Sequence, residues 1–318
     1  MKKKVSILNK TFTLNGKAGD QYFNDIPVDT AFYESYFPFL HQVIKDDSVC
    51  LDIGANIGLV SLALSQLNPK AKVYSFEPTP EIFRLLKENL DMNEIKNIVP
   101  FQLALSDKKQ KLNFINVNNY SAGNFSLNPE FTGKRKDVFG EYIQVQADTL
   151  DSWIEKNKLK KIDFIKLDVE GSELQVLKGA KNVLKKYKPI MVMEFNSYCY
   201  ILFQNKTPMD ALDEIFSYFE RIYKVNKMDS TLERIPNTEK AKNDFVESSL
   251  RNGFVDDLIC LPRGRTLPAQ DIPYSYQVLQ RENARLHGDL RRILDSRSWK
   301  IASFMQDTKK LFSRLIKK

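Results

Sequence analysis

An acid and a run of small residues form the segment Asp52-Ile-Gly-Ala-Asn-Ile-Gly58, and a second acid, Glu77, stands 25 residues after Asp52. Apolar residues before and after this segment predict a buried strand, a tight turn and a helix. Such a turn can direct backbone N–H groups at an anionic ligand. An acid at the end of the next strand lies where a ribose presents its hydroxyls. These features predict that the chain binds a cofactor that contains adenosine.

Two classes of cofactor compete for this turn. A dinucleotide-binding turn has the pattern G-x-G-x-x-G, whose middle glycine lets the backbone approach a pyrophosphate. Here Asn56 stands at that position, and Asp52 comes directly before the turn. A carboxylate there would repel a pyrophosphate but suits the ammonium group of a methionine moiety. The pattern Asp-x-Gly-x-Asn-x-Gly resembles the first motif of S-adenosylmethionine-dependent methyltransferases, with Glu77 as their ribose-binding acid.

A second group of acids, Asp168, Glu170 and Glu173, lies within six residues at the end of a predicted strand, residues 162–168. Open α/β sheets bind their ligands at this edge, beyond the carboxyl ends of the strands. Crowded carboxylates repel one another, which favours a site that uses them. The alternative is that they complement the dipole of the next helix. Glu194 ends the next strand, and we expect it at the same edge unless it points into solvent.

Further motifs make the resemblance specific to FkbM-type methyltransferases over residues 33–194. In chain order the matching motifs are Asp52–Gly58, Phe76-Glu-Pro78, Ala104-Leu-Ser-Asp107, Ala147-Asp-Thr-Leu-Asp151, Lys166-Leu-Asp-Val-Glu-Gly-Ser-Glu173 and Glu194-Phe195. The resemblance implies a Rossmann-like class I methyltransferase fold with S-adenosylmethionine as its cofactor. It also implies O-methyl transfer to a hydroxyl of a sugar, a polyketide or a similar natural product. Ser296-Arg-Ser-Trp-Lys300 resembles a tail motif of bacterial surface-glycan enzymes, which favours a sugar acceptor.

The resemblance also implies roles for individual residues. The first motif would hold the methionine end of the cofactor, the Glu-Pro pair the ribose, and the turn at 104–106 the adenine. The cofactor residues implied in this way are Glu34, Asp52, Gly54, Asn56, Gly58, Glu77, Pro78, Leu105 and Ser106. Glu34 is included because the family often has an acid before the first strand. Asp168 would lie beside the transferred methyl group.

Methyl transfer from a sulfonium needs mainly an acceptor oxygen held in line, since the methyl group is already activated. A sugar hydroxyl is a poor nucleophile near neutral pH, so a general base within hydrogen-bond reach helps. The motifs contain no histidine, which leaves carboxylates: the catalytic candidates are Asp168 first, then Glu170, Glu173 and Glu194. The same acids could hold a divalent cation through oxygen ligands. Because the sequence does not show that they converge, we predict no metal site.

The order of apolar and amphipathic segments predicts a mostly parallel, doubly wound α/β sheet of seven strands. The predicted strands are residues 49–53, 72–76, 98–103, 162–168, 189–195, 221–225 and 254–261. The predicted helices are residues 59–67, 80–92, 148–157, 172–187 and 208–219, with Ser172 and Gln175 spaced as a capping box. Two alternating stretches, 111–116 and 141–146, predict an inserted pair of strands. The polar and aromatic loop 118–126 between them is a candidate for acceptor contact, or else a surface loop.

Length and composition divide the chain of 318 residues into three parts: an N-terminal segment (1–46), the methyltransferase domain (47–262) and a basic helical tail (263–318). The whole chain has a net charge of +8, and the tail from Tyr274 holds eleven Lys/Arg against four Asp/Glu. The domain itself is therefore nearly neutral, which does not indicate a nucleic-acid partner. Three scattered cysteines predict reduced core thiols in a cytosolic protein, without disulfides or zinc. No apolar run reaches 18 residues, so we expect no transmembrane helix.

The tail has patterns of its own. Apolar residues and Asn283 at heptad spacing between residues 276 and 293 favour a short coiled coil and thus a homodimer. Residues 300–318 form a basic amphipathic pattern that fits peripheral contact with the inner face of a membrane, or packing against a protein. Two other functions remain open: a non-catalytic scaffold that retains the cofactor fold and acts through its tail, and a nucleotide-dependent oxidoreductase. Asn56 counts against the oxidoreductase, and the intact acids Asp52, Glu77, Asp168 and Glu173 count against the scaffold.

Overall fold

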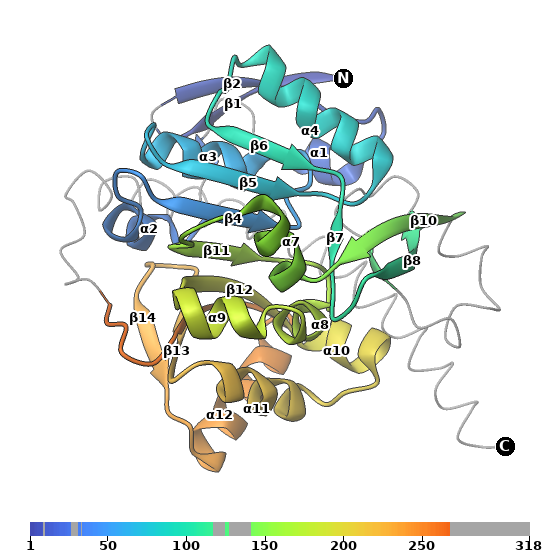
Figure 1. The fold of residues 1–318 in the computed structure, drawn as a ribbon. Coiled ribbons are helices and arrows are strands. Elements are labelled where there is room, and N and C mark those ends of the chain that lie inside the picture. Colours follow the sequence, from blue (N-terminus) through green and yellow to red (C-terminus); the bar gives the residue numbers. More distant parts are fainter. Residues whose placement is uncertain (9, 27–30, 33, 117–124, 127–140, 268–318) are drawn as a thin grey trace, which may run out of the picture. The chain divides into compact units, whose positions relative to one another are not determined.

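The computed structural model describes residues 1–8, 10–26, 31–32, 34–116, 125–126 and 141–267. Its central feature is an eight-stranded sheet (Figure 1). From one edge to the other its strands are β14 (Leu232–Ile235), β13 (Arg221–Val225), β15 (Val255–Leu261), β12 (Ile190–Asn196), β11 (Phe164–Leu167), β4 (Val49–Ile53), β5 (Lys72–Phe76) and β6 (Ile98–Phe101). The five strands from β12 to β6 are parallel, and β13, β14 and β15 pair antiparallel.

This topology confirms the predicted Rossmann-like, mostly parallel sheet, with one strand more than the seven expected. The extra strand, β14, pairs with β13 at the edge of the sheet. It lies in a segment whose polar composition does not distinguish an exposed edge strand from a connection. Of its four residues only Ile235 is buried.

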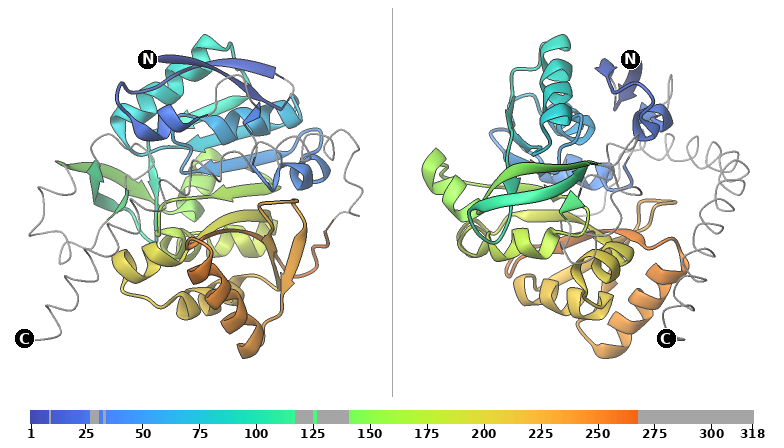
Figure 2. Two further views of the ribbon diagram at one scale, coloured as in Figure 1. Left: turned by 180° about the vertical axis from the view of Figure 1, so that it is seen from behind. Right: turned by 90° about the vertical axis from the view of Figure 1, so that its right-hand side faces the viewer.

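Helices cover both faces of the sheet, which makes it doubly wound (Figures 1 and 2). Successive side chains of a strand point to opposite faces, so Cys50 joins the core on one side while Leu51 and Ile53 join the core on the other. The first core includes α2 (Phe37–Val43), α3 (Leu59–Leu67) and α4 (Pro80–Met92). The second includes α7 (Leu150–Asn157), α8 (Glu173–Lys178), α9 (Lys181–Tyr187), α10 (Ser197–Gln204), α11 (Pro208–Tyr218) and α12 (Glu239–Arg251).

The N-terminal segment contributes to the first core. Strands β1 (Lys2–Ile7), β2 (Lys10–Asn15) and β3 (Ala31–Phe32) form a small sheet, and α1 (Gln21–Asp25) follows β2. Two asparagines of α4 hold β2: Asn89 bonds the N–H and C=O of Asn15, and Asn93 bonds those of Thr13. The predicted boundary at residues 46–47 therefore separates two segments that share a core.

A second, four-stranded sheet has the order β7 (Ala104–Leu105), β10 (Glu141–Asp148), β8 (Gln110–Asn116), β9 (Phe125–Ser126). It contains the inserted pair of strands that the alternating stretches predict. Figure 1 shows β8 and β10 beyond the carboxyl ends of the parallel strands. Of the loop predicted to contact the acceptor, only Phe125 and Ser126 belong to the described residues, and the rest lies outside them.

One predicted helix, residues 172–187, is two helices, because α8 ends at Lys178 and α9 begins at Lys181. At Gly179 a Cβ atom would lie 2.0 Å from the carbonyl oxygen of Ser106, so only glycine allows this close approach. The predicted capping box is wrong, since the side chain of Ser172 makes no capping hydrogen bond. The prediction also missed α10, which is short and apolar almost throughout, and α12, which is mostly polar and buries only Phe245 and Ser249.

All three cysteines, at positions 50, 199 and 260, are buried and unpaired, as predicted. Within the described ranges, no helix has the length and apolar composition needed to span a membrane. The predicted coiled coil and amphipathic helix, from residue 276 onward, lie outside the described residues.

Candidate active site

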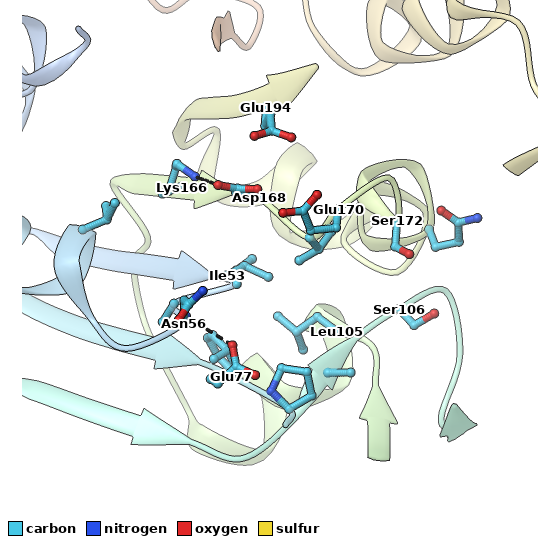
Figure 3. A pocket seen from close by; sticks show the side chains of 18 of the residues that line it. Ile53, Asn56, Glu77, Leu105, Ser106, Lys166, Asp168, Glu170, Ser172 and Glu194 are labelled. Carbon is cyan, nitrogen blue, oxygen red and sulfur yellow. Dashed lines mark hydrogen bonds and ion pairs between the residues drawn. The ribbon is translucent and has the colours of Figure 1, made fainter. Parts of the chain in front are cut away.

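A cavity of about 630 Å³ lies at the carboxyl ends of the parallel strands (Figure 3). This volume is in the range of sites for small molecules and cofactors. Ten of the predicted site residues line it: Glu34, Gly54, Asn56, Glu77, Pro78, Leu105, Ser106, Asp168, Glu170 and Glu194. Three do not: Asp52, Gly58 and Glu173. Residues from distant parts of the chain thus meet in one site.

The turn after β4 brings the backbone close to the end of β11. Gly54 has φ +88°, and a Cβ atom there would lie 1.7 Å from the carbonyl oxygen of Asp168. The N–H groups of Gly54 and Ala55 both donate to the carbonyl oxygen of Phe76 at the end of β5. Asn56 also has positive φ, +48°, which asparagine tolerates better than most residues. Gly58 precedes α3 and serves the turn rather than the cavity wall.

Glu77 follows β5 and is 7% exposed. One carboxylate oxygen accepts the N–H of Asn56 at 3.2 Å, and the other accepts the N–H of Thr79 at 2.8 Å. Burial raises the pKa of Glu77 to about 7, and these two hydrogen bonds act in the opposite direction. A carboxylate oxygen can accept more than one hydrogen bond, so Glu77 remains able to bind the hydroxyls of a ribose.

The turn at residues 104–106, which is predicted to hold the adenine, also forms part of the cavity wall. Leu105 and Ser106 line it together with the apolar side chains of Leu103, Leu112 and Phe114. The N–H of Ser106 donates to the carbonyl oxygen of Asp148, which ties this turn to the inserted sheet. An apolar wall with a few polar groups is what a planar base needs.

Asp52 is 1% exposed and lies behind the cavity wall. Its carboxylate accepts a hydrogen bond of 2.5 Å from the Ser61 hydroxyl of α3. Burial raises the pKa of Asp52 to about 6, and the charge of Lys166 opposes this rise. The structure therefore places Asp52 where it supports the turn and Lys166, and gives it no direct access to a ligand in the cavity.

Lys166 was missed as a site residue by the sequence analysis. Its ammonium group is 2.8 Å from Asp168 Oδ2, and its side chain is only 4% exposed. The charges of Asp168 and Asp52 raise the pKa of Lys166 and outweigh its burial, which alone would lower it. The available signal was a lysine in an otherwise apolar strand, Phe164-Ile-Lys-Leu167, since a buried lysine requires a partner.

Asp168, Glu170 and Glu194 line the same cavity, and Figure 3 shows them around one side of it. Asp168 directly follows β11, and its N–H donates to the carbonyl oxygen of Ile53. Burial raises the pKa of Glu170 and of Glu194, and the charge of Asp168 raises both further. Within the part of the chain that the structure describes, Asp168 is the one of the three with an ammonium partner at hydrogen-bond distance.

Glu173 is fully buried and does not reach the cavity. Its Oε1 atom accepts the N–H groups of Val169 and Gly171, both at 3.1 Å. Burial raises the pKa of Glu173 to about 7. Glu173 thus holds the loop that carries Asp168 and Glu170, which is a positioning role, and the structure does not place it among the reacting groups.

Further polar residues that the sequence analysis did not single out complete the wall near Glu34: Tyr36, Lys227 and Asp257. Burial and the charge of Asp257 raise the pKa of Glu34 to about 8, and the charges of Lys166 and Lys227 lower it. Glu34 is predicted to lie at the cofactor, but its charged neighbours lie in or directly after β11, β13 and β15. Among the described residues, no group of three or more His, Cys, Asp or Glu is arranged to hold a metal ion.

Comparison with known proteins identifies the family of this chain. The family model of the FkbM methyltransferase domain matches residues 52–225. The 2-O-methyltransferase NoeI of Sinorhizobium fredii is 30% identical over 187 residues, which cover 56% of this chain and 74% of that protein. The hexuronic acid methyltransferase AglP of Haloferax volcanii is 30% identical over 153 residues, 48% of this chain and 58% of that protein.

Methyltransferase sdnD of Sordaria araneosa is 35% identical over 153 residues, covering 41% of this chain and 59% of that protein. The chain thus spans between about three fifths and three quarters of the length of these relatives. The matched region contains the turn at Gly54, Glu77, and the loop from Asp168 to Glu173. The match to a methyltransferase family identifies S-adenosylmethionine as the cofactor and rules out the alternative of a nucleotide-dependent oxidoreductase. The chain belongs to the FkbM family of methyltransferases.

Proposed function

We propose that this protein transfers the methyl group of S-adenosylmethionine to a hydroxyl of a saccharide, in a bacterial surface glycan or a related natural product. One observation carries the proposal. A single cavity joins a nucleoside end, at Glu77, Leu105 and Ser106, to a group of acids around Asp168. The names of two relatives, a 2-O-methyltransferase and a hexuronic acid methyltransferase, support a hydroxyl-bearing sugar as the acceptor.

The residues present fit the cofactor. Gly54 lets the turn pass close to the end of β11, and Gly54 and Asn56 both line the cavity. Glu77 would hold the ribose, Leu105 and Ser106 the adenine, and the turn with Asn56 the methionine end. When bound, S-adenosylmethionine supplies a sulfonium methyl group, whose bond to sulfur breaks as its bond to the acceptor oxygen forms.

The protein's own part is to hold the acceptor and to take its proton. Asp168 is the carboxylate that we assign as the general base. Its Oδ2 atom is paired with Lys166 at 2.8 Å, which leaves Oδ1 to accept a hydrogen bond from the acceptor hydroxyl. Glu170 and Glu194, with raised pKa values, stand beside it and provide further hydrogen-bonding groups. The fully buried Glu173 keeps the loop in place.

The test is an assay of methyl transfer with purified protein, labelled S-adenosylmethionine and a panel of saccharide acceptors. Transfer to a hydroxyl, identified by mass spectrometry of the product, supports the proposal. Cofactor binding without transfer to any acceptor supports the scaffold alternative.

The tail's contact with a membrane, dimerisation through the tail, and a cytoplasmic location belong to this proposal as well. Vesicle sedimentation and size-exclusion chromatography test the first two.

A further inference from the structure

The part of the cavity wall around Glu34 is built from four separate segments. Glu34 and Tyr36 precede α2, Asp168 follows β11, Glu194 lies in β12, and Asp257 lies in β15. Glu194 and Asp257 are directly opposite each other in the antiparallel ladder of β12 and β15. The charges of Asp257 and Asp168 both act on Glu34. We call this group of side chains the acid wall: Glu34, Tyr36, Asp168, Glu194 and Asp257.

Tyr36 gives the acid wall an unused hydrogen-bond donor. Its side chain is 1% exposed and lines the cavity, and its hydroxyl has no hydrogen-bond partner among the described residues. Burial raises the pKa of Tyr36, and the charges of Glu34, Asp257 and Asp168 raise it further, so this hydroxyl keeps its proton. Buried hydroxyls are nearly always paired. An unpaired one at a cavity indicates a group of a ligand that accepts its hydrogen bond.

The charge of the acid wall restricts what that ligand is. Four carboxyl groups face the cavity here, and two ammonium groups, of Lys166 and Lys227, lie near them. Lys166 already pairs with Asp168, and the Nζ atom of Lys227 donates to the carbonyl oxygen of Val255 at 3.0 Å. Burial raises the pKa of Glu34, Glu194 and Asp257, so these carboxyl groups already resist ionisation. A buried anionic ligand would repel the carboxylates that stay ionised or require them to take up protons, whereas hydroxyl groups can bond to carboxyls in either protonation state.

We propose that the acid wall is the acceptor subsite and that it binds an uncharged, hydroxyl-bearing ring in preference to the same ring with a carboxylate. Tyr36 donates a hydrogen bond to an oxygen of that ring, and Glu34 and Asp257 accept hydrogen bonds from its hydroxyls. The inference rests on the proposed function. It specifies in addition where the acceptor binds and that the preferred acceptor is uncharged.

The first experiment compares acceptors that differ only at carbon 6. The p-nitrophenyl glucoside and glucuronide form one pair, and the corresponding galactoside and galacturonide form another. We expect kcat/KM, measured from the S-adenosylhomocysteine released, to be at least about tenfold higher for the neutral member. Equal values, or a preference for the uronides, overturn the inference. Transfer to none of the four by a protein that binds S-adenosylmethionine also overturns it, whereas failure to bind the cofactor is a failure of the proposed function.

The second experiment locates the subsite with variants. Tyr36→Phe is expected to raise KM for the neutral glycoside about tenfold and to leave the Kd for S-adenosylmethionine unchanged. Asp257→Asn is expected to reduce the ratio of kcat/KM between the neutral glycoside and the uronide, because it removes one carboxyl group that can ionise. Glu233→Gln, an exposed acid of β14, is the matched control and should change neither value. If Tyr36→Phe and Asp257→Asn instead weaken cofactor binding and leave KM unchanged, the acid wall belongs to the cofactor and the inference is wrong.

Discussion

At the scale of single residues, the site places similar carboxyl groups in different surroundings and so gives them different roles. Asp168 pairs with a buried ammonium group and faces the cavity. Glu77 faces the cavity and is held by two backbone N–H groups. Asp52 and Glu173 are buried behind the wall and support the turn and the loop. Residue type alone could not separate these roles, because all four are acids near the carboxyl ends of the strands β4, β5 and β11.

Replacing Asp168 by asparagine tests its role as the base. The amide keeps the size of the side chain but cannot take a proton, so we expect kcat to fall by about 10²–10⁴-fold. The Kd for S-adenosylmethionine should stay within about threefold, because Asp168 is not assigned to the cofactor. Single-turnover methyl transfer and calorimetry measure the two quantities. Unchanged turnover would remove Asp168 from the mechanism.

Glu173→Gln tests the cost of a buried carboxylate through its dependence on pH. The pKa of Glu173 is about 7 in the folded protein, against an ordinary value of 4.5. Between these values the folded state holds more protons than the unfolded state, so this group's contribution to stability falls as pH rises. The glutamine side chain of the variant keeps an oxygen for the N–H groups of Val169 and Gly171 and never ionises.

The variant should therefore gain stability relative to the natural protein as pH rises from 5 to 8, by up to about 3 kcal/mol. Urea unfolding at several pH values measures this difference, in which the contributions of the other buried acids cancel. A difference that stays constant with pH would show that Glu173 does not ionise in this range, or that its pKa is not raised.

Among the helices and strands, the site depends on where the parallel strands end and on how closely the ends of β4 and β11 approach each other. The sequence predicts the turn after β4 and the loop after β11 because their glycines and acids are neighbours in the chain. It does not predict that Tyr36 and Asp257 belong to the acid wall. Both lie in segments with no motif, and only the tertiary fold brings them to the same cavity as Asp168. Lys166 belongs to one of the motifs, but Asp52, which lies beside it in the sheet, is on the neighbouring strand β4, 114 residues earlier in the chain.

Gly54→Ala tests the close approach of β4 and β11. Its Cβ atom would lie 1.7 Å from the carbonyl oxygen of Asp168, so the backbone of one strand end must move. We expect a loss of about 3 kcal/mol or more in the free energy of unfolding and the loss of cofactor binding. Gly253→Ala is the matched control, since it also has positive φ, +103°, but nothing within 4 Å.

In the control, the free energy of unfolding should fall only by the cost of the strained backbone conformation, about 1–2 kcal/mol. The control should bind S-adenosylmethionine normally. Thermal unfolding and calorimetry give both quantities for both variants. Equal effects on stability and binding would mean that the turn tolerates a side chain and that its glycine serves conformation alone.

At the scale of the whole molecule, the N-terminal segment is tied to the cofactor turn by one side chain. Asn89 of α4 is fully buried and bonds Asn15 of β2, and its Nδ2 atom also donates to the carbonyl oxygen of Ile57 at 2.9 Å. The sequence analysis treated residues 1–46 as a separate part. No local pattern could reveal this link, because Asn89 and Asn15 lie 74 residues apart.

Asn89→Ala leaves the backbone groups of Asn15 and Ile57 without their partner. We expect it to lower the free energy of unfolding by about 2–4 kcal/mol and to raise the Kd for S-adenosylmethionine. Asn93→Ala is the control, because Asn93 bonds Thr13 of β2 in the same way but not the turn. It should lower stability and spare binding. Equal losses of affinity in both variants would show that Asn89 has no specific link to the cofactor turn.

We infer that the cavity at the strand ends binds S-adenosylmethionine. The most direct test is calorimetric titration of the purified protein with S-adenosylmethionine, S-adenosylhomocysteine and NAD in parallel, repeated with Glu77→Ala. We predict that the first two bind, that NAD does not, and that Glu77→Ala weakens binding by about 10–100-fold through the loss of hydrogen bonds to a charged group. Binding of NAD alone, or unchanged affinity in Glu77→Ala, would contradict the account.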